Sequence, residues 1–255
     1  MARPEDVVPP TILYVHDDLE ELIQRRLGPA PAPLAAARGL MALLGQQPRV
    51  AVLALAEQID ALAARGAHAP FAVTVGIAEA GERVARQVHG RTGWFPEVHR
   101  VEITRVEDGD DYRLDTGGTP LTHQLAPFAG AASLAVVDDT VFSGLTMRTV
   151  LDALPPGALA RASAFCLRAV GESLPEVRTR CPMSAGFAAQ GRLLEEVSFI
   201  NASGLVQRGA IRRAGRPPLA FFERPAWIRA WFPHAADEVT TRCRALCDLL
   251  EEARA

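Results

Sequence analysis

The stretch Ser133–Met147, SLAVVDDTVFSGLTM, combines two adjacent carboxylates with a loop that contains hydroxyl groups and glycine. Apolar residues lead to Asp138 and Asp139, and residues 140–146 follow with a Ser-Gly-Leu-Thr ending. Carboxylates accept hydrogen bonds from sugar hydroxyls, directly or through magnesium-bound water. The free N–H groups at a helix start attract phosphate, and Gly144 lets the backbone approach it. The stretch therefore predicts a site for a phosphorylated pentose.

Other kinds of site also place acids at the end of a strand. Helix capping is an alternative role for Asp138 and Asp139, because aspartate is favoured at helix starts. A haloacid-dehalogenase-type phosphatase requires an Asp-x-Asp pattern, whereas these two aspartates are adjacent. A receiver domain requires a later lysine, and a Walker-type P-loop requires Gly-Lys-Ser/Thr. The chain contains no lysine, which argues against both.

The elements that must position these residues alternate between strands and helices. Apolar runs predict strands at residues 71–79, 99–104, 133–139 and 161–170, with helices after the first and third. This alternation predicts an α/β fold with an open, mostly parallel sheet and flanking helices. In such a sheet ligands bind beyond the carboxyl ends of the strands, which is where Asp138 and Asp139 are expected.

The rest of the chain divides into an N-terminal and a C-terminal region. A strand is expected at 11–15, a helix at 19–28, a stiff connector at Pro29–Pro33 and two helices within 34–64. The last third gathers aromatic residues at 221–232 and ends in an amphipathic helix. We therefore expect an N-terminal helical segment at 1–65 that packs on the core, an α/β core at 66–175, and a C-terminal hood or acceptor-binding region at 176–255.

Composition narrows the class of protein. The chain has 255 residues and a formal net charge of -3, so we expect neither nucleic acid nor a membrane surface as a partner. No apolar run reaches the roughly 18 residues that span a bilayer. The opening residues lack the basic and apolar regions of a signal peptide, which favours a cytoplasmic location. The four cysteines form no CxxC pair, so they are expected to be buried thiols.

The sequence AVVDDTVFSGLT resembles the phosphoribosyl-pyrophosphate (PRPP) loop of type I phosphoribosyltransferases. The resemblance implies that Asp138 and Asp139 bind the ribose hydroxyls and hold Mg²⁺ through water. It also implies the fold of that family and a homodimer. The residues that it assigns to the 5′-phosphate are Thr140, Val141, Phe142, Ser143, Gly144, Leu145 and Thr146.

Two upstream segments match further parts of the family pattern. Small residues after the strand at 71–79 resemble the pyrophosphate loop, which assigns Ala78, Glu79, Ala80 and Gly81 to PRPP. The polar segment 105–124 stands where the family has a mobile loop that closes over the reacting centre. Arg105 and His123 of this segment are assigned to catalysis, with Arg105 neutralising the leaving pyrophosphate. The sequences GIAEAG, ITR and LTHQL resemble a branch associated with bacterial tellurite- and stress-resistance gene clusters.

The resemblance implies a Mg²⁺-dependent transfer of 5-phosphoribosyl from PRPP to a small, heterocyclic acceptor, with release of pyrophosphate. One position departs from the purine-salvage members, which carry an aspartate where this chain has Phe142. An apolar ring cannot take a proton from a base. The alternative is therefore a regulatory protein of the same fold that binds PRPP or a nucleotide without turnover.

Overall fold

The computed structural model describes residues 12–109 and 111–252, which form two compact units. The core unit consists of residues 56–105 and 114–193. The terminal unit consists of the described residues of 12–55, 106–113 and 194–252. These boundaries differ from the expected segments at 1–65, 66–175 and 176–255, because residues from both ends of the chain come together in one unit.

A five-stranded parallel sheet forms the centre of the core unit. Its strand order is β4 (Val98–Val101), β3 (Val73–Ile77), β7 (Leu134–Val141), β8 (Ala162–Val170) and β9 (Met183–Ala189). All four neighbouring pairs run in parallel. The three inner strands consist mostly of buried residues, as expected of a parallel sheet that is covered on both faces. The predicted α/β fold with an open parallel sheet is confirmed.

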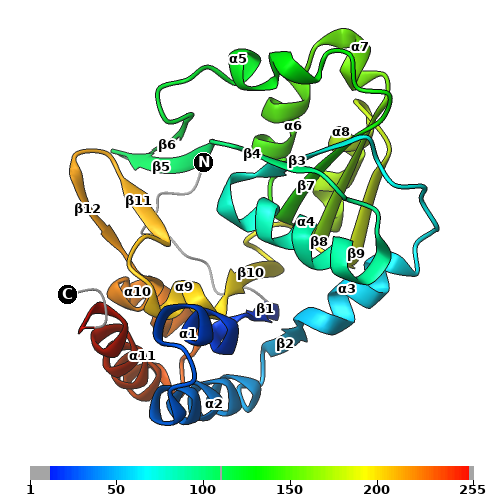
Figure 1. Ribbon diagram of the computed structural model, residues 1–255. Coiled ribbons are helices and arrows are strands. Elements are labelled where there is room, and N and C mark those ends of the chain that lie inside the picture. Colours follow the sequence, from blue (N-terminus) through cyan, green and yellow to red (C-terminus); the bar gives the residue numbers. More distant parts are fainter. Residues whose placement is uncertain (1–11, 110, 253–255) are drawn as a thin grey trace. The chain divides into compact units, whose positions relative to one another are not determined.

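Helices cover both faces of this sheet. Figure 1 shows α4 (Ala78–Thr92) on one face, with α6 (Leu145–Asp152) and α8 (Leu174–Arg178) on the other. The unit also contains α3 (Leu55–Ala63), α5 (Leu121–Leu125) and α7 (Pro156–Leu159), and the 3-10 turns η1 (Ala126–Phe128) and η2 (Gly171–Ser173). Within the described part of the chain, no helix is long and apolar enough to cross a membrane.

The polar segment that was expected to be a mobile loop has regular structure. It contains β5 (Thr104–Asp108), β6 (Asp111–Asp115) and α5. These strands belong to a small sheet of order β12-β11-β5-β6, formed with β11 (Ile211–Arg213) and β12 (Arg216–Leu219). The pairing of β5 with β11 is parallel. Backbone hydrogen bonds to residues that are distant in the sequence stabilise the segment. Its polar sequence does not predict these hydrogen bonds.

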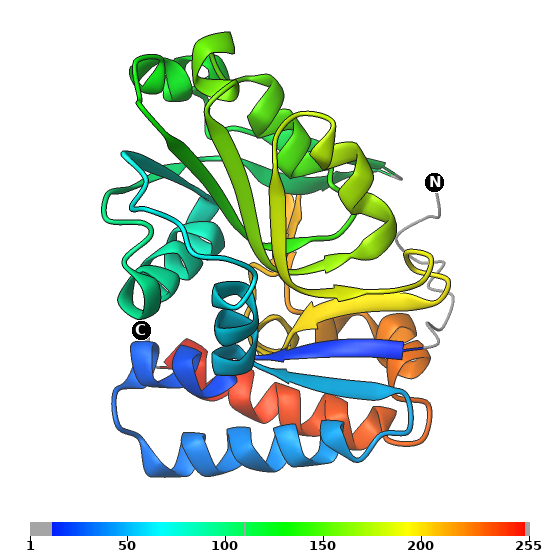
Figure 2. The same cartoon turned by 90° about the vertical axis from the view of Figure 1, so that its right-hand side faces the viewer.

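The terminal unit has a parallel sheet of its own. Its strand order is β10 (Val197–Asn201), β1 (Ile12–Asp17) and β2 (Val50–Ala54). Figure 2 shows α2 (Pro31–Gly45) and α11 (Ala236–Glu252) side by side along this sheet. Their buried residues share one apolar cluster with Leu13 and Val15 of β1. The other helices of the unit are α1 (Leu19–Leu27), α9 (Ala202–Val206), η3 (Phe221–Glu223) and α10 (Pro225–Trp231).

Two expectations for the N-terminal region are corrected. The connector expected at Pro29–Pro33 overlaps α2, which begins at Pro31. Proline is accepted in the first turn of a helix because the N–H groups there have no partner within the helix. The helical run expected within 34–64 is interrupted by the strand β2, whose alanine, valine and leucine residues resemble those of the neighbouring helices.

Candidate functional site

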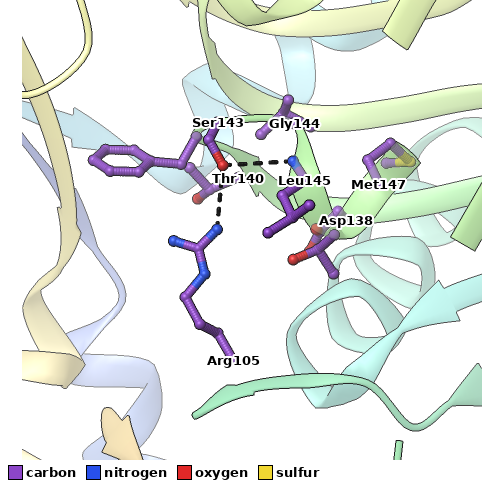
Figure 3. A pocket seen from close by; sticks show the side chains of 10 residues that line it. Arg105, Asp138, Thr140, Ser143, Gly144, Leu145 and Met147 are labelled. Atoms are coloured by element: carbon purple, nitrogen blue, oxygen red, sulfur yellow. Dashed lines mark hydrogen bonds between the residues drawn. The ribbon is translucent and has the colours of Figure 1, made fainter. Parts of the chain in front are cut away.

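A pocket of about 230 Å³ lies where β7 ends and α6 begins. Figure 3 shows the side chains around it, all of which belong to the core unit. The structure thus brings together Arg105, one acid of the predicted pair and the whole predicted phosphate loop. The lining residues are Arg105, Asp138, Thr140, Val141, Phe142, Ser143, Gly144, Leu145, Thr146 and Met147.

The turn before α6 depends on Gly144. This residue has a φ of 73°, a left-handed conformation that glycine adopts without strain. A Cβ atom there would lie 3.3 Å from Cγ2 of Val177 on α8, so the turn also packs closely against α8. The hydroxyl of Ser173 donates a hydrogen bond to the carbonyl of Phe142 at 2.6 Å. The loop is therefore held in one shape by residues that follow β8.

Arg105 lies beside the phosphate loop. Its Nη2 atom donates a hydrogen bond to Oγ of Ser143 at 3.2 Å, and Figure 3 shows the guanidinium pointing at this loop. The N–H of Leu145 lies 3.5 Å from the same oxygen. An arginine, a hydroxyl and the amides of a helix start together form a strong set of phosphate donors. Arg105 therefore contacts the predicted phosphate loop, and its expected role at the leaving pyrophosphate stays a prediction.

Asp138 lines the pocket although its side chain is almost fully buried. The residue is 8% exposed, and its Oδ1 accepts the N–H of Asp139 at 2.8 Å. Burial and the neighbouring charge of Asp139 raise the pKa of this carboxyl well above its usual value. The raised pKa favours a protonated Asp138, which can donate a hydrogen bond as well as accept one.

Asp139 makes an ion pair with a fully buried arginine. Nη2 of Arg168 on β8 lies 3.1 Å from Oδ2 of Asp139, and Nη1 of Arg168 donates to Oε1 of Gln58 at 3.4 Å. Arg168 and Gln58 are not among the site residues predicted from the sequence. An arginine inside the apolar strand RASAFCLRAV was a usable signal, since a buried arginine almost always needs a partner.

The predicted pyrophosphate loop lies against the strand that carries the acids. Ala78 has a φ of 50°, which is an unfavourable conformation for a residue with a Cβ atom. A Cβ atom on Gly81 would lie 2.3 Å from the carbonyl oxygen of Val137 and 3.3 Å from Cα of Asp138. The first turn of α4 therefore approaches β7 directly before the acid pair. Glu79 is exposed and Ala80 is half-buried in this turn.

His123 does not line the pocket that the described residues form, and neither do Asp139 and the predicted residues 78–81. His123 is exposed on α5. The next residue, Gln124, anchors this part of the chain by donating to the carbonyls of Glu102, Thr116 and Thr119.

The donors at the acid pair do not form a set that would bind magnesium directly. Within residues 12–109 and 111–252 there is no group of three or more His, Cys, Asp or Glu that could hold a metal ion. Asp139 already has a cationic partner, and the raised pKa of Asp138 disfavours its charged form. The nearby thiol of Cys166 is no candidate ligand or nucleophile either, because burial and then the charge of Asp138 raise its pKa.

The aromatic segment at 221–232 lies in the terminal unit. The rings of Phe221, Trp227 and Trp231 lie 5.5–6.1 Å apart. Trp231 and Phe232 are buried in the apolar cluster of that unit. Much of this segment therefore contributes to packing, and its expected role in binding an acceptor stays a prediction.

Comparisons with known proteins give a likeness only among solved structures. No family model and no curated protein matches the sequence. A protein from Aquifex aeolicus matches at 16% identity and a TM-score of 0.36, over 46% of this chain and 54% of its own. This chain thus spans about half the length of that protein.

Two phosphoribosyltransferases are also among the structural neighbours. An orotate phosphoribosyltransferase from Aeropyrum pernix matches at 18% identity over 52% of this chain and 70% of its own, with a TM-score of 0.36. A purine phosphoribosyltransferase from Pyrococcus horikoshii matches at 15% identity over 57% of this chain and 86% of its own, with a TM-score of 0.37. At such low identities and TM-scores these likenesses assign no function to this chain, so the function has to be argued from the residues of the site.

Proposed function

We propose that this protein is a phosphoribosyltransferase that moves a 5-phosphoribosyl group from PRPP to a small heterocyclic acceptor. The observation that supports the proposal most is the pocket formed by Arg105, Asp138 and the loop 140–147. It joins a turn suited to phosphate to the carboxyl group of Asp138, which can accept hydrogen bonds from a sugar hydroxyl. A phosphorylated pentose is the ligand class that has both features.

In the proposed reaction the loop and Arg105 hold the 5′-phosphate, while Asp138 and Asp139 hold the ribose hydroxyls. The bond between C1 and the pyrophosphate oxygen breaks with the electron pair leaving on oxygen. A nitrogen of the acceptor then forms the new bond to C1. The transition state has oxocarbenium character, so catalysis comes from positioning and from stabilising charge on the leaving group. Ala78, Glu79, Ala80 and Gly81 are proposed to contact that group.

Magnesium enters this proposal bound to the pyrophosphate of PRPP, where it supplies positive charge to the leaving group. The donor set at the acid pair does not favour a directly bound ion, so contact of the acids with such an ion through water stays a proposal. The residue at the purine-salvage acid position is Phe142, which takes no proton. The acceptor must therefore lose its proton to solvent or react in an anionic form.

An assay of pyrophosphate release tests this function. The protein is incubated with PRPP, Mg²⁺ and a panel of heterocyclic acceptors, and we expect release that depends on one acceptor class. Arg105→Met is expected to raise KM for PRPP at least about tenfold, because a hydrogen bond to a charged group contributes about 1.5–3 kcal/mol. The control is Arg86→Met, which removes an exposed arginine of α4 that pairs with Glu82. This variant should leave KM unchanged.

The alternative is a regulatory protein that binds PRPP or a nucleotide without turnover. The apolar residue Phe142 within the loop is the observation that favours it. Tight binding of PRPP with no pyrophosphate release from any acceptor would support this alternative. No binding of PRPP would contradict the transferase, and no binding of either PRPP or a nucleotide would contradict both functions.

A further inference from the structure

We propose that Arg168 is a positioning residue. It compensates the charge of Asp139 and fixes the orientation of the Asp139 carboxylate, so that this carboxylate can accept hydrogen bonds from the ribose hydroxyls. The inference rests on the proposed function and adds to it the way in which the sugar is recognised. Resemblance to the PRPP loop involves the loop residues alone, whereas Arg168 comes from the next strand, β8.

In the ion pair of Arg168 and Asp139, the arginine is fully buried and the aspartate is partly exposed to solvent. Arg168 is 0% exposed, and its Nη2 lies 3.1 Å from Oδ2 of Asp139. The Asp139 side chain keeps 16% of its surface accessible. In the pairing of β7 with β8, Arg168 stands opposite Thr140, a lining residue of the pocket. The arginine thus approaches the end of β7 from inside the protein, and part of the Asp139 side chain stays accessible, although Asp139 is not among the residues that line the pocket.

A second contact holds the arginine in place. Its Nη1 donates a hydrogen bond to Oε1 of Gln58, a residue of α3 that is 3% exposed. The amide of Gln58 carries no charge, so this contact fixes the guanidinium without compensating its charge. α3 begins before the α/β core expected at 66–175, so a helix from outside the expected core supports the site.

One of the two acids at this end of β7 already has a cationic partner. Arg168 compensates the charge of Asp139 at 3.1 Å. A carboxylate that is already paired attracts a divalent cation less than a free one, but still accepts hydrogen bonds from neutral hydroxyls. The acid pair is therefore suited to a sugar diol, and binding of the pentose should not require magnesium.

The experiment compares two probes on four proteins in the absence of magnesium. Ribose 5-phosphate, titrated by calorimetry, reports on both halves of the pocket, and inorganic phosphate, followed by ³¹P NMR, reports on the loop alone. The proteins are wild type, Arg168→Met, Arg168→Lys and the control Arg65→Met. Arg65 follows α3, and its guanidinium donates a long hydrogen bond of 3.4 Å to the carbonyl of Gly186, which is not part of the Arg168 contacts.

We expect Arg168→Met to bind ribose 5-phosphate at least tenfold more weakly than wild type, with phosphate affinity changed less than twofold. Arg168→Lys should restore part of the loss, and Arg65→Met should match wild type for both probes. A purely structural role for Arg168 would weaken both probes together, which would overturn the inference.

Unchanged binding of ribose 5-phosphate by Arg168→Met would overturn the inference as well, but would leave the proposed function standing. If wild type bound neither ribose 5-phosphate nor PRPP, the proposed function itself would fail. The two failures are therefore distinguishable.

Discussion

At the scale of residues, the site combines two neighbouring acids with different surroundings. Asp138 is buried beside the pocket, and its pKa is raised by burial and by the charge of Asp139. Asp139 has the charge of Arg168 next to it. The two neighbouring carboxyl groups therefore have different electrostatic surroundings, which shift the pKa of Asp138 upward and give Asp139 a cationic partner.

The raised pKa of Asp138 predicts a dependence of stability on pH. The folded protein keeps this proton at pH values where the unfolded chain, with a pKa near 3.8, has lost it. Stability contributed by Asp138 is thus complete below pH 3.8 and is lost as the pH rises toward the raised pKa. Each unit of the shift corresponds to about 1.4 kcal/mol.

We therefore expect Asp138→Asn to be more stable than wild type at pH 8 by more than about 1 kcal/mol. The advantage should disappear near pH 4, and denaturant unfolding at both pH values measures it. Asp152→Asn is the control, because Arg180 lowers the pKa of this exposed acid on α6, which gives the opposite sign. If Asp138→Asn were less stable than wild type at pH 8, the prediction would be contradicted. The wild-type acid would then be ionised and stabilised by its partners in the folded protein.

The residues of the pocket were predictable where they follow one another along the chain. Asp138 and residues 140–146 belong to one strand end and the loop after it, so a short sequence pattern contains them. Arg168 and Gln58 were not predictable as site residues, because they reach Asp139 from β8 and α3. Nothing in the local sequence around Asp139 indicates which distant side chain will be its partner.

At the scale of elements, the close contact of α4 with β7 determines where the first loop and the acid pair meet. Gly81 lies in the first turn of α4, and a side chain there would run into the backbone of β7 at Val137. A backbone atom cannot move aside as the end of a flexible side chain can, so the whole helix would have to shift.

We expect Gly81→Ala to lower the free energy of unfolding by about 1–3 kcal/mol, as overpacking does. It should also weaken binding of ribose 5-phosphate, because the displaced contact is next to Asp138. Gly90→Ala on the same helix is the matched control: no atom lies within 4 Å of its Cβ position, so it should stabilise by about 0.5–1 kcal/mol. Chemical denaturation of both variants tests the pair. Equal effects of the two substitutions would contradict the assigned contact.

Most elements of the core sheet were predictable from their patterns, whereas pairing over long distances was not. The runs that contain β3, β7 and β8 are apolar and bounded by helices, which indicates buried parallel strands. β5 and β6 are polar, and they form strands because β11 offers a neighbouring edge. This partner strand lies about a hundred residues further along the chain, so the local pattern of polar and apolar side chains does not predict the pairing.

At the scale of the whole molecule, the chain builds two units from interleaved segments. The terminal unit collects residues before 56, around the β5–β6 turn and after 193, and each unit has its own apolar cluster. Linear segments at 1–65, 66–175 and 176–255 followed from composition, which cannot show that the two ends of a chain share one sheet. The parallel pairing of β1 with β10 joins them.

The pocket lies within the core unit, and its proposed binding of PRPP can be tested on the intact chain without knowing the acceptor. The most direct measurement is a calorimetric titration of PRPP, with and without Mg²⁺, on wild type and on Asp138→Asn/Asp139→Asn. We predict that wild type binds PRPP and that the double variant loses most of the affinity in both conditions. Unchanged affinity in a folded double variant would contradict the account, because the pentose would then bind away from the end of β7.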